Sequence, residues 1–570
     1  MQQARLILAA TLAPIFTFGI QAAPAIFPLK DVRAGQHGIG RTVFSGTRVE
    51  DFQVEILGVL KNIGPRESII LAKLSGGPLA ETGVLQGMSG SPVYIDGKLV
   101  GAVALGFPQA KEAIAGIRPI EEMLRVDPDS ATRLAKSIPP RRSVQAGNAR
   151  LEEIATPVSF SGFTAATLDR FGSQLRALGL DPRQGVSGGG DPPAKLGDPK
   201  QLQPGSMISV QLLTGDMSVG ADGTVTYIDG DRVYAFGHRF LDEGATNLPF
   251  ARSEVLALLP NISSSFKIST ARDWMGTITE DRNTAVSGLL GRRAEMAPIE
   301  IRVGRNRYRM NVIEDRVMTP LVAQMAVFSA IDETERSIGA STFSIRGHLD
   351  FNSGSVRIDD VYGGDVGVSA LASLGVGTPL AYALSSGFDA LKLKAISLDI
   401  DEIDRRNQLQ ISSIAAPRQV RPGEDVDLIV TMSGQNGGEV SKTAHYRVPA
   451  GALPGVLYFT AEDSTSANLA EFQAAAGSPP RSAGQVIERL NSQRVNTSAY
   501  LRVWRAEAAY NIDGRDLPDV PPSLALILGR AQASGANPAS WRGSTLAEIA
   551  VSAAGDIVTG SKTIQVEVTE

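Results

Sequence analysis

Short stretches in which apolar and polar residues alternate dominate the chain, and glycine, proline and Asp-Gly pairs separate them. A period of two is typical of strands with one buried face, and turn residues mark where such strands end. From "DVRAGQHGIGRTVFSG" to "AGIRPIEEML" this pattern predicts a small β-barrel or sandwich, which we assign to residues 26–147. A second block opens at "SMISVQLLTGDMSVG" and predicts another β-rich unit over residues 206–335.

One hairpin can be predicted together with its turn. In "SPVYIDGKLVGAV", residues 91–103, two apolar runs flank Asp96 and Gly97. An Asp-Gly pair supplies the positive φ angles that a two-residue hairpin turn needs. The preceding "GMSGSP" holds Ser89 between two glycines and closes with a proline, so the sequence predicts a tight loop that leads into the hairpin.

A helix and a linker are expected between the two β-rich blocks. Residues 148–186 read as a connecting strand and a helix, because Leu168, Phe171, Leu175 and Leu178 share one helical face and Thr164 can serve as N-cap. Residues 187–205, "SGGGDPPAKLGDPKQLQPG", combine glycine, proline and charge, a composition that does not build a core. We predict an interdomain linker there.

The remaining chain predicts two further units. Residues 336–412 combine strand-like segments with a helix and indicate a small α+β unit. Residues 413–570 alternate from "VRPGEDVDLIVTM" to "SKTIQVEV", which favours a β-sandwich, and "SPPRSAGQVIERLNSQR" predicts a helical insertion in it. A chain of 570 residues agrees with three or four domains of about 150 residues each.

The N-terminus has the order of a secretory signal. Arg5 precedes an apolar run from Leu6 to Ile20, and small residues around Ala25 follow. We expect residues 1–25 to be removed, with a retained anchor as the alternative. No other stretch has the roughly 18 uninterrupted apolar residues of a membrane span, so we expect no transmembrane segment in the mature form. The expected location is the periplasm or the outside of a bacterial cell.

Composition narrows the possible chemistry. The chain has 55 basic and 60 acidic residues, a formal net charge of −5, so nucleic acid is not an expected partner. It has no cysteine, which excludes disulfides and thiolate chemistry, and its four dispersed histidines form no short-spaced metal cluster. No phosphate-binding "GxxxxGK[ST]" motif occurs. We therefore expect no metal and no cofactor.

Nucleophilic catalysis remains, and it needs a base beside the serine. A serine hydroxyl is a weak nucleophile until a neighbouring group, most often histidine, accepts its proton. His37, His348 and His445 lie in contexts typical of structural or exposed residues. His238, in "FGHRF", follows the strand-like "DRVYAF" directly, where a strand ends and a glycine lets the chain turn.

These segments resemble a known family. "QGMSGSPVYIDGKLVGAV" resembles the nucleophile region of the SpoIVB-type serine peptidases, and "VRAGQHGIGRTVFSGTRVEDFQVEI" and "AGIRPIEEML" are similar to its flanks. "GTVTYIDGDRVYAFGHRF" and "MGTITEDRNTAVSGLLG" are similar to the family's histidine block. The resemblance covers roughly residues 30–125 and 205–292.

The resemblance implies a serine endopeptidase with Ser89 as nucleophile and His238 as general base. "GMSGSP" also resembles the "GDSGGP" loop of chymotrypsin-like proteases. The implied fold is mainly β: a permuted chymotrypsin-like double β-barrel, then the small α+β unit and the C-terminal β-sandwich. The N–H groups of Gly87 and Ser89 would form the oxyanion hole.

Two departures leave alternatives open. The serine block precedes the histidine block here, in the reverse of the family's order. The family's acidic position falls near Ser75, so the third triad member is unknown; Glu67, Glu81, Asp216, Asp229 and Asp242 are acids nearby in sequence but match no motif. The expected partner is a peptide or protein substrate, with a cell-envelope protein also possible. The alternative is an inactive peptidase-like scaffold that binds peptides or envelope components.

Overall fold

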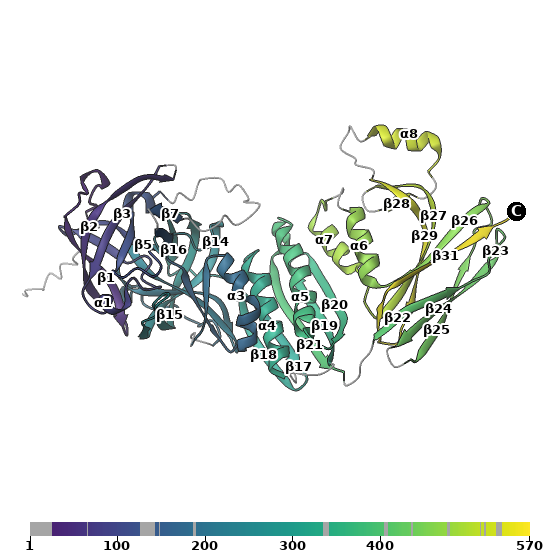
Figure 1. The fold of residues 1–570 in the computed structure, drawn as a ribbon, viewed down its shortest axis with the longest axis horizontal. Helices are drawn as coiled ribbons and strands as arrows, with labels where there is room; N and C mark the ends of the chain where they lie inside the picture. Colours follow the sequence, from purple (N-terminus) through teal and green to yellow (C-terminus); the bar gives the residue numbers. More distant parts are fainter. Residues whose placement is uncertain are drawn as a thin grey trace, which may run out of the picture.

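The computed structural model is an elongated, mainly β molecule with 53% strand and 19% helix. Purple and blue β-barrels form one end in Figure 1, and a green and yellow sandwich forms the other. The structure describes residues 25–64, 66–125, 143–146, 149–185, 190–334, 341–403, 408–434, 437–475, 479–512, 515–517, 520–531 and 539–570. The expected signal peptide lies outside these residues, except for its last position.

The first barrel closes from six strands in the order β4-β1-β2-β3-β6-β5, with β4 paired to β5. Buried and exposed residues alternate along β2, so that Phe52, Val54 and Ile56 point into the core. The predicted hairpin is confirmed, because Ile95 pairs with Lys98 while Asp96 and Gly97 have φ angles of 50° and 72°. The elements are β1 (His37–Ser45), β2 (Arg48–Gly64), β3 (Glu67–Ser75), α1 (Leu79–Thr82), β4 (Pro92–Ile95), β5 (Lys98–Gly106), β6 (Ile114–Pro119) and α2 (Ile120–Met123).

The second barrel also closes from six strands, in the order β12-β13-β16-β15-β14-β11, with β11 paired to β12. The two rings confirm the prediction of a double β-barrel. The strands are β11 (Met207–Gly215), β12 (Ser218–Asp229), β13 (Arg232–Ala235), β14 (Gly244–Leu259), β15 (Phe266–Arg282) and β16 (Ala285–Leu290).

The segments between the barrels belong to the barrel sheets. Strands β7 (Ser143–Ala146) and β8 (Ala149–Glu153) extend the first sheet, and β9 (Thr156–Ser161) and β10 (Leu180–Gln184) extend the second. The predicted helix is α3 (Ala165–Ala177), with Thr164 at its N-cap position. The interdomain linker stays a prediction; within its described part, Gly197 donates its N–H to the carbonyl of Trp274 of β15 at 2.7 Å, and a residue without a side chain can lie this close to the strand.

The sheet of the second barrel does not end at residue 335. It continues through β18 (Asn306–Ile313), β17 (Met296–Val303), β21 (Leu393–Glu402), β19 (Ser341–Phe351) and β20 (Gly354–Gly364), so the predicted α+β unit is an extension of one 13-stranded sheet. The link is a parallel pairing of β17 with β21, which sequence alternation cannot reveal. Helices α4 (Met318–Thr334) and α5 (Val368–Ser385) pack against each other and against this extension.

Among the described residues, α5 is long and apolar enough to cross a membrane by length and composition. It contacts α4, β19 and β20, and Ala372, Val376 and Leu380 are fully buried. Its apolar composition therefore agrees with a helix that covers a sheet.

The C-terminal region is a two-sheet sandwich with its own core. Its strands are β22 (Gln408–Ala415), β23 (Gln419–Val420), β24 (Asp425–Gly434), β25 (Glu439–Arg447), β26 (Gly455–Glu462), β27 (Ser498–Ile512), β28 (Arg515–Leu517), β29 (Ala539–Ser552), β30 (Ile557–Thr559) and β31 (Ser561–Val568). The helix of the predicted insertion is α7 (Ala483–Asn491), whereas α6 (Ser464–Ala475) precedes the predicted segment and α8 (Pro522–Ala531) is a further helix. Val486, Ile487 and Leu490 of α7 join the core beneath α5 and β20, so the insertion docks the sandwich onto the long sheet.

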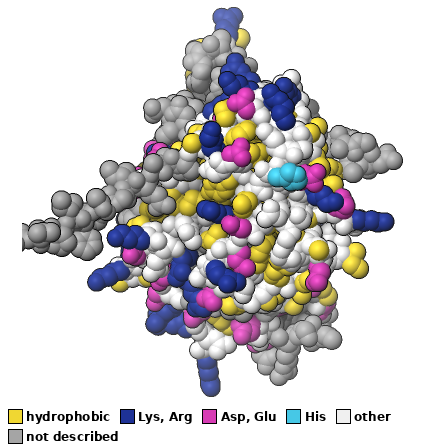
Figure 2. Space-filling view, turned by 90° about the vertical axis from the view of Figure 1, so that its left-hand side faces the viewer, with side chains coloured by type: hydrophobic (Ala, Val, Ile, Leu, Met, Phe, Trp, Pro, Cys, Tyr) yellow, Lys and Arg dark blue, Asp and Glu magenta, His cyan; other side chains and the backbone are white. Residues whose placement is uncertain are grey.

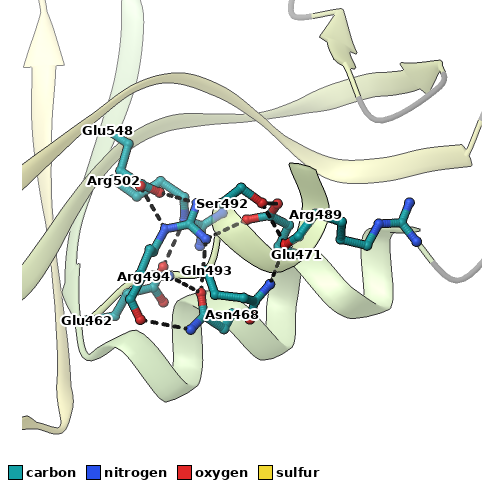
Figure 3. A network of polar contacts seen from close by, with 9 residues as sticks. All are labelled: Glu462, Asn468, Glu471, Arg489, Ser492, Gln493, Arg494, Arg502 and Glu548. Carbon is teal, nitrogen blue, oxygen red and sulfur yellow. Dashed lines mark hydrogen bonds and ion pairs between the residues drawn. The ribbon is translucent and has the colours of Figure 1, made fainter. Parts of the chain in front are cut away.

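Arg494, after α7, ties the insertion to the sandwich (Figure 3). Its Nε and Nη2 lie 2.7 and 2.8 Å from the carboxylate of Glu548 on β29, and its Nη1 contacts Glu471 and Asn468 of α6. Burial disfavours the charge, but the hydrogen bonds to both carboxylates outweigh it and raise the pKa of Arg494. The guanidinium thus bridges a helix and a strand from distant parts of the sequence.

Arg494→Met should loosen the insertion, because two partly buried carboxylates lose their shared cation. We expect a local loss of about 2 kcal/mol, measured as faster amide hydrogen exchange in α6. Arg447→Met, which changes an exposed arginine of β25, is the matched control and should leave exchange in α6 unchanged. Equal exchange in both variants would contradict this account.

Candidate active site

The loop that carries Ser89 is held from two sides. Within the first barrel, Gly90 donates its N–H to Val103 at 2.7 Å, and Val103 donates its own to Ser91 at 3.0 Å. From the second barrel, Thr224 of β12 donates its N–H to the carbonyl of Ser89 at 2.8 Å. A strand of the second barrel therefore orders the serine loop of the first.

Two hydroxyl groups of β12 complete this contact. Thr224 Oγ1 donates to the carbonyl of Gly87 at 2.8 Å, and Thr226 Oγ1 donates to the carbonyl of Gly90 at 2.7 Å. All these groups are buried, and a buried carbonyl without a hydrogen-bond donor would reduce the stability of the fold. The loop conformation is thus specified by hydrogen bonds across the interface between the barrels.

Gly90 permits this close approach. Its φ is +93°, and a Cβ at this position would lie 2.0 Å from the carbonyl oxygen of Thr224 and 2.5 Å from the nitrogen of Phe236. Gly87, with φ +89°, has the Cδ of Lys267 3.3 Å from the place of a Cβ. Backbone conformation favours glycine at both positions, and at Gly90 the space also excludes any side chain.

The carbonyl groups of the loop are satisfied, and two of its N–H groups remain available. Met88, Gly90 and Ser91 donate their N–H groups to Leu85, Val103 and Met88, respectively. The N–H groups of Gly87 and Ser89 donate no hydrogen bond within the described part of the chain. Two alternate amides of one tight loop are therefore free to bind an oxygen.

His238 follows β13 through an unusual backbone. Phe236 has φ +70° and Gly237 has φ +69°. A positive φ is strained for phenylalanine, and such strain concentrates at functional sites. A Cβ on Gly237 would lie 3.2 Å from both Val103 O and Ala104 Cβ of β5, so the histidine segment and the serine loop contact the same stretch of β5. The structure thus brings the two sequence motifs into one interface.

The imidazole has a defined partner at one nitrogen. His238 is 2% exposed, and its Nδ1 lies 2.6 Å from the carbonyl oxygen of Arg239. A carbonyl only accepts, so Nδ1 carries the hydrogen and Nε2 is the basic nitrogen of the neutral ring. The Oγ of Ser89 is buried and makes no hydrogen bond in the part of the chain that the structure describes. Catalytic hydrogen bonds often form only with substrate.

The acids considered from sequence occupy different positions in the two barrels. Ser75 ends β3, exposed and paired with Gln53, so it offers no carboxylate. Glu67 lies 3.3 Å from Arg118, and Asp216 accepts the N–H of Arg309. Glu81 and Asp229 are exposed, whereas Asp242 lies 3.9 Å from Arg239.

Sequence reasoning missed two buried titratable side chains beside the loop, Lys267 and Asp222. Lys267 is 2% exposed, packs along Gly87 and donates from Nζ to Thr42 Oγ1 at 2.8 Å. Burial lowers its pKa to about 7, against the attraction of Asp222, and burial raises the pKa of Asp222 to about 6. Ser269 donates to Asp222 at 2.7 Å. Only the closed barrel shows that this lysine of β15 points inward.

A cleft of about 400 Å³ opens between the barrels near this interface. Its walls include residues 82–84 and 86, which lead into the serine loop, and 261–265 from the turn between β14 and β15. Glu153, another wall residue, lies 3.6 Å from the guanidinium of Arg239, next to the histidine. The cleft therefore reaches the serine loop through Gln86, which precedes it, and the histidine segment only through the contact of Glu153 with Arg239.

Among the described residues, no three His, Cys, Asp or Glu side chains gather in a way that could hold a metal ion.

The first part of the chain is similar to a known family. Residues 20–124 match the family model described as SpoIVB peptidase S55. The match supports the resemblance of the segment that carries the Ser89 loop to this family, and it does not include the segment that carries His238. No match was found among curated proteins or among solved structures.

Gly90→Ala should disrupt the interface between the barrels. A methyl group there collides with Thr224, so we expect a loss well above the about 1–2 kcal/mol that a left-handed conformation alone costs a non-glycine residue. Gly97→Ala is the matched control, since Gly97 also has positive φ but has open space around it. Urea unfolding of both variants measures the difference, and equal losses would refute the clash.

Lys267 should make stability depend on pH. Its pKa is about 7 in the folded chain, below the ordinary lysine value of 10.5 that holds in the unfolded chain, so between these values the unfolded chain binds more protons and folding stability rises with pH. Lys267→Met should therefore lose stability relative to the wild type as pH rises from 7 to 10. Urea unfolding across that range tests this, with the exposed Lys98→Met as control. Parallel curves for wild type and Lys267→Met would contradict it.

Proposed function

We propose that the protein is an exported serine endopeptidase with Ser89 as nucleophile and His238 as general base. The arrangement of the serine loop carries the proposal: it presents the amides of Gly87 and Ser89 without acceptors among the described residues, in contact with the segment that ends at His238. The family match over the serine block supports the same reaction class.

In this mechanism, Ser89 Oγ forms a bond to the carbonyl carbon of a peptide while Nε2 of His238 takes the hydroxyl proton. The carbonyl electrons move to oxygen, and the amides of Gly87 and Ser89 stabilise that charge. The imidazolium then gives its proton to the leaving amine as the C–N bond breaks. Water, activated by the same imidazole, hydrolyses the acyl-enzyme.

The cleft between the barrels is the proposed entry for the substrate. It is lined by segments from both barrels, and Ile262 at its edge is 95% exposed. An exposed apolar side chain beside a cleft suits contact with a peptide chain. We propose a peptide or protein as substrate.

We propose the location of the protein and its kind of partner from the N-terminal sequence and the surface charge. The charged, apolar and small-residue order of residues 1–25 supports a periplasmic or extracellular location. On the barrel end in Figure 2, basic and acidic side chains are interspersed, which agrees with a protein partner better than with a polyanion. A cell-envelope protein as partner is part of the proposal.

One observation favours a second function. Ser89 and His238 are 0% and 2% exposed, and Ser75 stands where the family has an acid. An inactive scaffold that binds extended peptides along its strands would need neither exposed catalytic atoms nor a triad.

A fluorophosphonate probe distinguishes the two functions. We expect the wild-type protein to be labelled at Ser89, with no labelling in Ser89→Ala and at least about a hundredfold slower labelling in His238→Ala. Mass spectrometry locates the label. Ser91→Ala is the matched control, because Ser91 is equally buried in the same loop, and its labelling should match the wild type.

Circular dichroism must first show that all variants are folded. If the folded wild-type protein is not labelled at any pH, the peptidase proposal is wrong and the inactive peptide-binding scaffold is favoured.

A further inference from the structure

Asp281 is a buried carboxylate directly behind the histidine segment. It lies near the end of β15 and is 1% exposed. Its Oδ1 accepts the N–H of Phe240 at 2.7 Å, and its Oδ2 accepts the N–H groups of Leu241 and Asp242, the latter at 2.8 Å. One side chain therefore holds three successive amides of the loop that follows His238.

The peptide group that donates the first of these hydrogen bonds also accepts a hydrogen bond from the imidazole of His238. The peptide unit between Arg239 and Phe240 accepts from His238 Nδ1 at its carbonyl and donates to Asp281 at its N–H. This unit is planar and rigid, and hydrogen bonds at its two ends polarise one another. A negative charge at the N–H end makes the carbonyl oxygen a better acceptor for Nδ1–H.

We propose that Asp281 is the acidic positioning residue of the Ser89–His238 site and acts on the imidazole through the Arg239–Phe240 peptide group. The inference rests on the proposed function for its catalytic meaning. In the usual triad a carboxylate contacts the imidazole directly, holds its tautomer and stabilises the imidazolium. Here the carboxylate does both through one intervening peptide unit, so its electrostatic effect on the ring is weaker than direct contact.

Other contacts immobilise the same peptide unit. The side chain of Arg239 extends to Glu153 at 3.6 Å and to Asp242 at 3.9 Å. The positive φ of Phe236 and of Asp242 encloses the segment between two tight bends. Because both ends of the loop are constrained, the carbonyl of Arg239 keeps its direction toward the ring.

The charges around Asp281 agree with a positioning group. Burial raises its pKa to about 6, while the three backbone N–H groups oppose that rise by favouring the anion. Asp242 faces it as a like charge, and Glu243 lies nearby with a pKa raised to about 9 by burial and by Asp315. Of the three neighbouring carboxylates of Asp281, Asp242 and Glu243, that of Asp281 is therefore the one that accepts three backbone N–H groups.

Nuclear magnetic resonance of protein labelled with ¹⁵N-histidine tests the proposal directly. The chain has four histidines, and His238→Ala assigns the His238 signal. In the wild type we expect the neutral ring to carry its proton on Nδ1. Asp281→Asn should weaken this preference and lower the pKa of His238, because the anion behind the peptide unit is gone.

The same variant should shift the pH profile of fluorophosphonate labelling. We expect labelling at least about tenfold slower, with its acidic limb moved to lower pH along with the His238 pKa. Glu280→Gln is the matched control, since Glu280 is the adjacent buried acid of β15 and pairs with Arg282 at 2.8 Å. It should leave the tautomer and the profile unchanged.

If Asp281→Asn does not fold, a pH titration of the wild-type protein tests the proposal instead. Protonation of Asp281, followed by carboxyl ¹³C shifts, should move the Phe240 amide and the His238 Nδ1 signals with one common midpoint.

Protonation of Nε2 in the neutral wild-type ring, unchanged signals in folded Asp281→Asn, or separate midpoints in the wild type would overturn the positioning proposal. Absent labelling of the wild type together with the expected tautomer would instead refute the peptidase function and leave the Asp281 contact supported.

Discussion

The contact between β12 and the serine loop is the constraint on which the site depends. Thr224 and Thr226 satisfy the carbonyls of Gly87, Ser89 and Gly90 from the other barrel. Because these carbonyls are buried, removing their donors would leave several polar groups unsatisfied at once. Neither barrel alone can hold the loop in this conformation. Any catalytic geometry at Ser89 therefore depends on the contact between the two barrels.

Buried charges surround this contact and are stabilised in different ways. Lys267 has a hydroxyl at 2.8 Å and a carboxylate whose charge attracts it, whereas Asp281 is surrounded by three amides. Burying such groups costs free energy unless hydrogen bonds compensate, so a protein retains them where position or charge is needed. Both flank a loop of the candidate site, Lys267 beside Gly87 and Asp281 behind His238.

Local features were predictable because short-range chemistry decides them. The Asp96-Gly97 turn and the helix after Thr164 agree with the sequence pattern, as does the insertion before Arg494. Long-range pairing was not predictable. The parallel pairing of β17 with β21 joins the α+β extension to the second barrel. The alternation of apolar and polar residues in either strand does not indicate which strand it pairs with.

From the amino-acid sequence one can predict a mainly β protein with a serine between two glycines and a histidine after a strand, because turn chemistry and strand periodicity are local properties. It could not point to Asp281, the positioning residue that we propose, since a position-by-position match led to Ser75 while Asp281 reaches the loop after His238 only through strand pairing. The tertiary structure decided which buried groups meet. Barrel closure brings β5, β12 and β15 around one interface, and burial there makes each hydrogen bond specific.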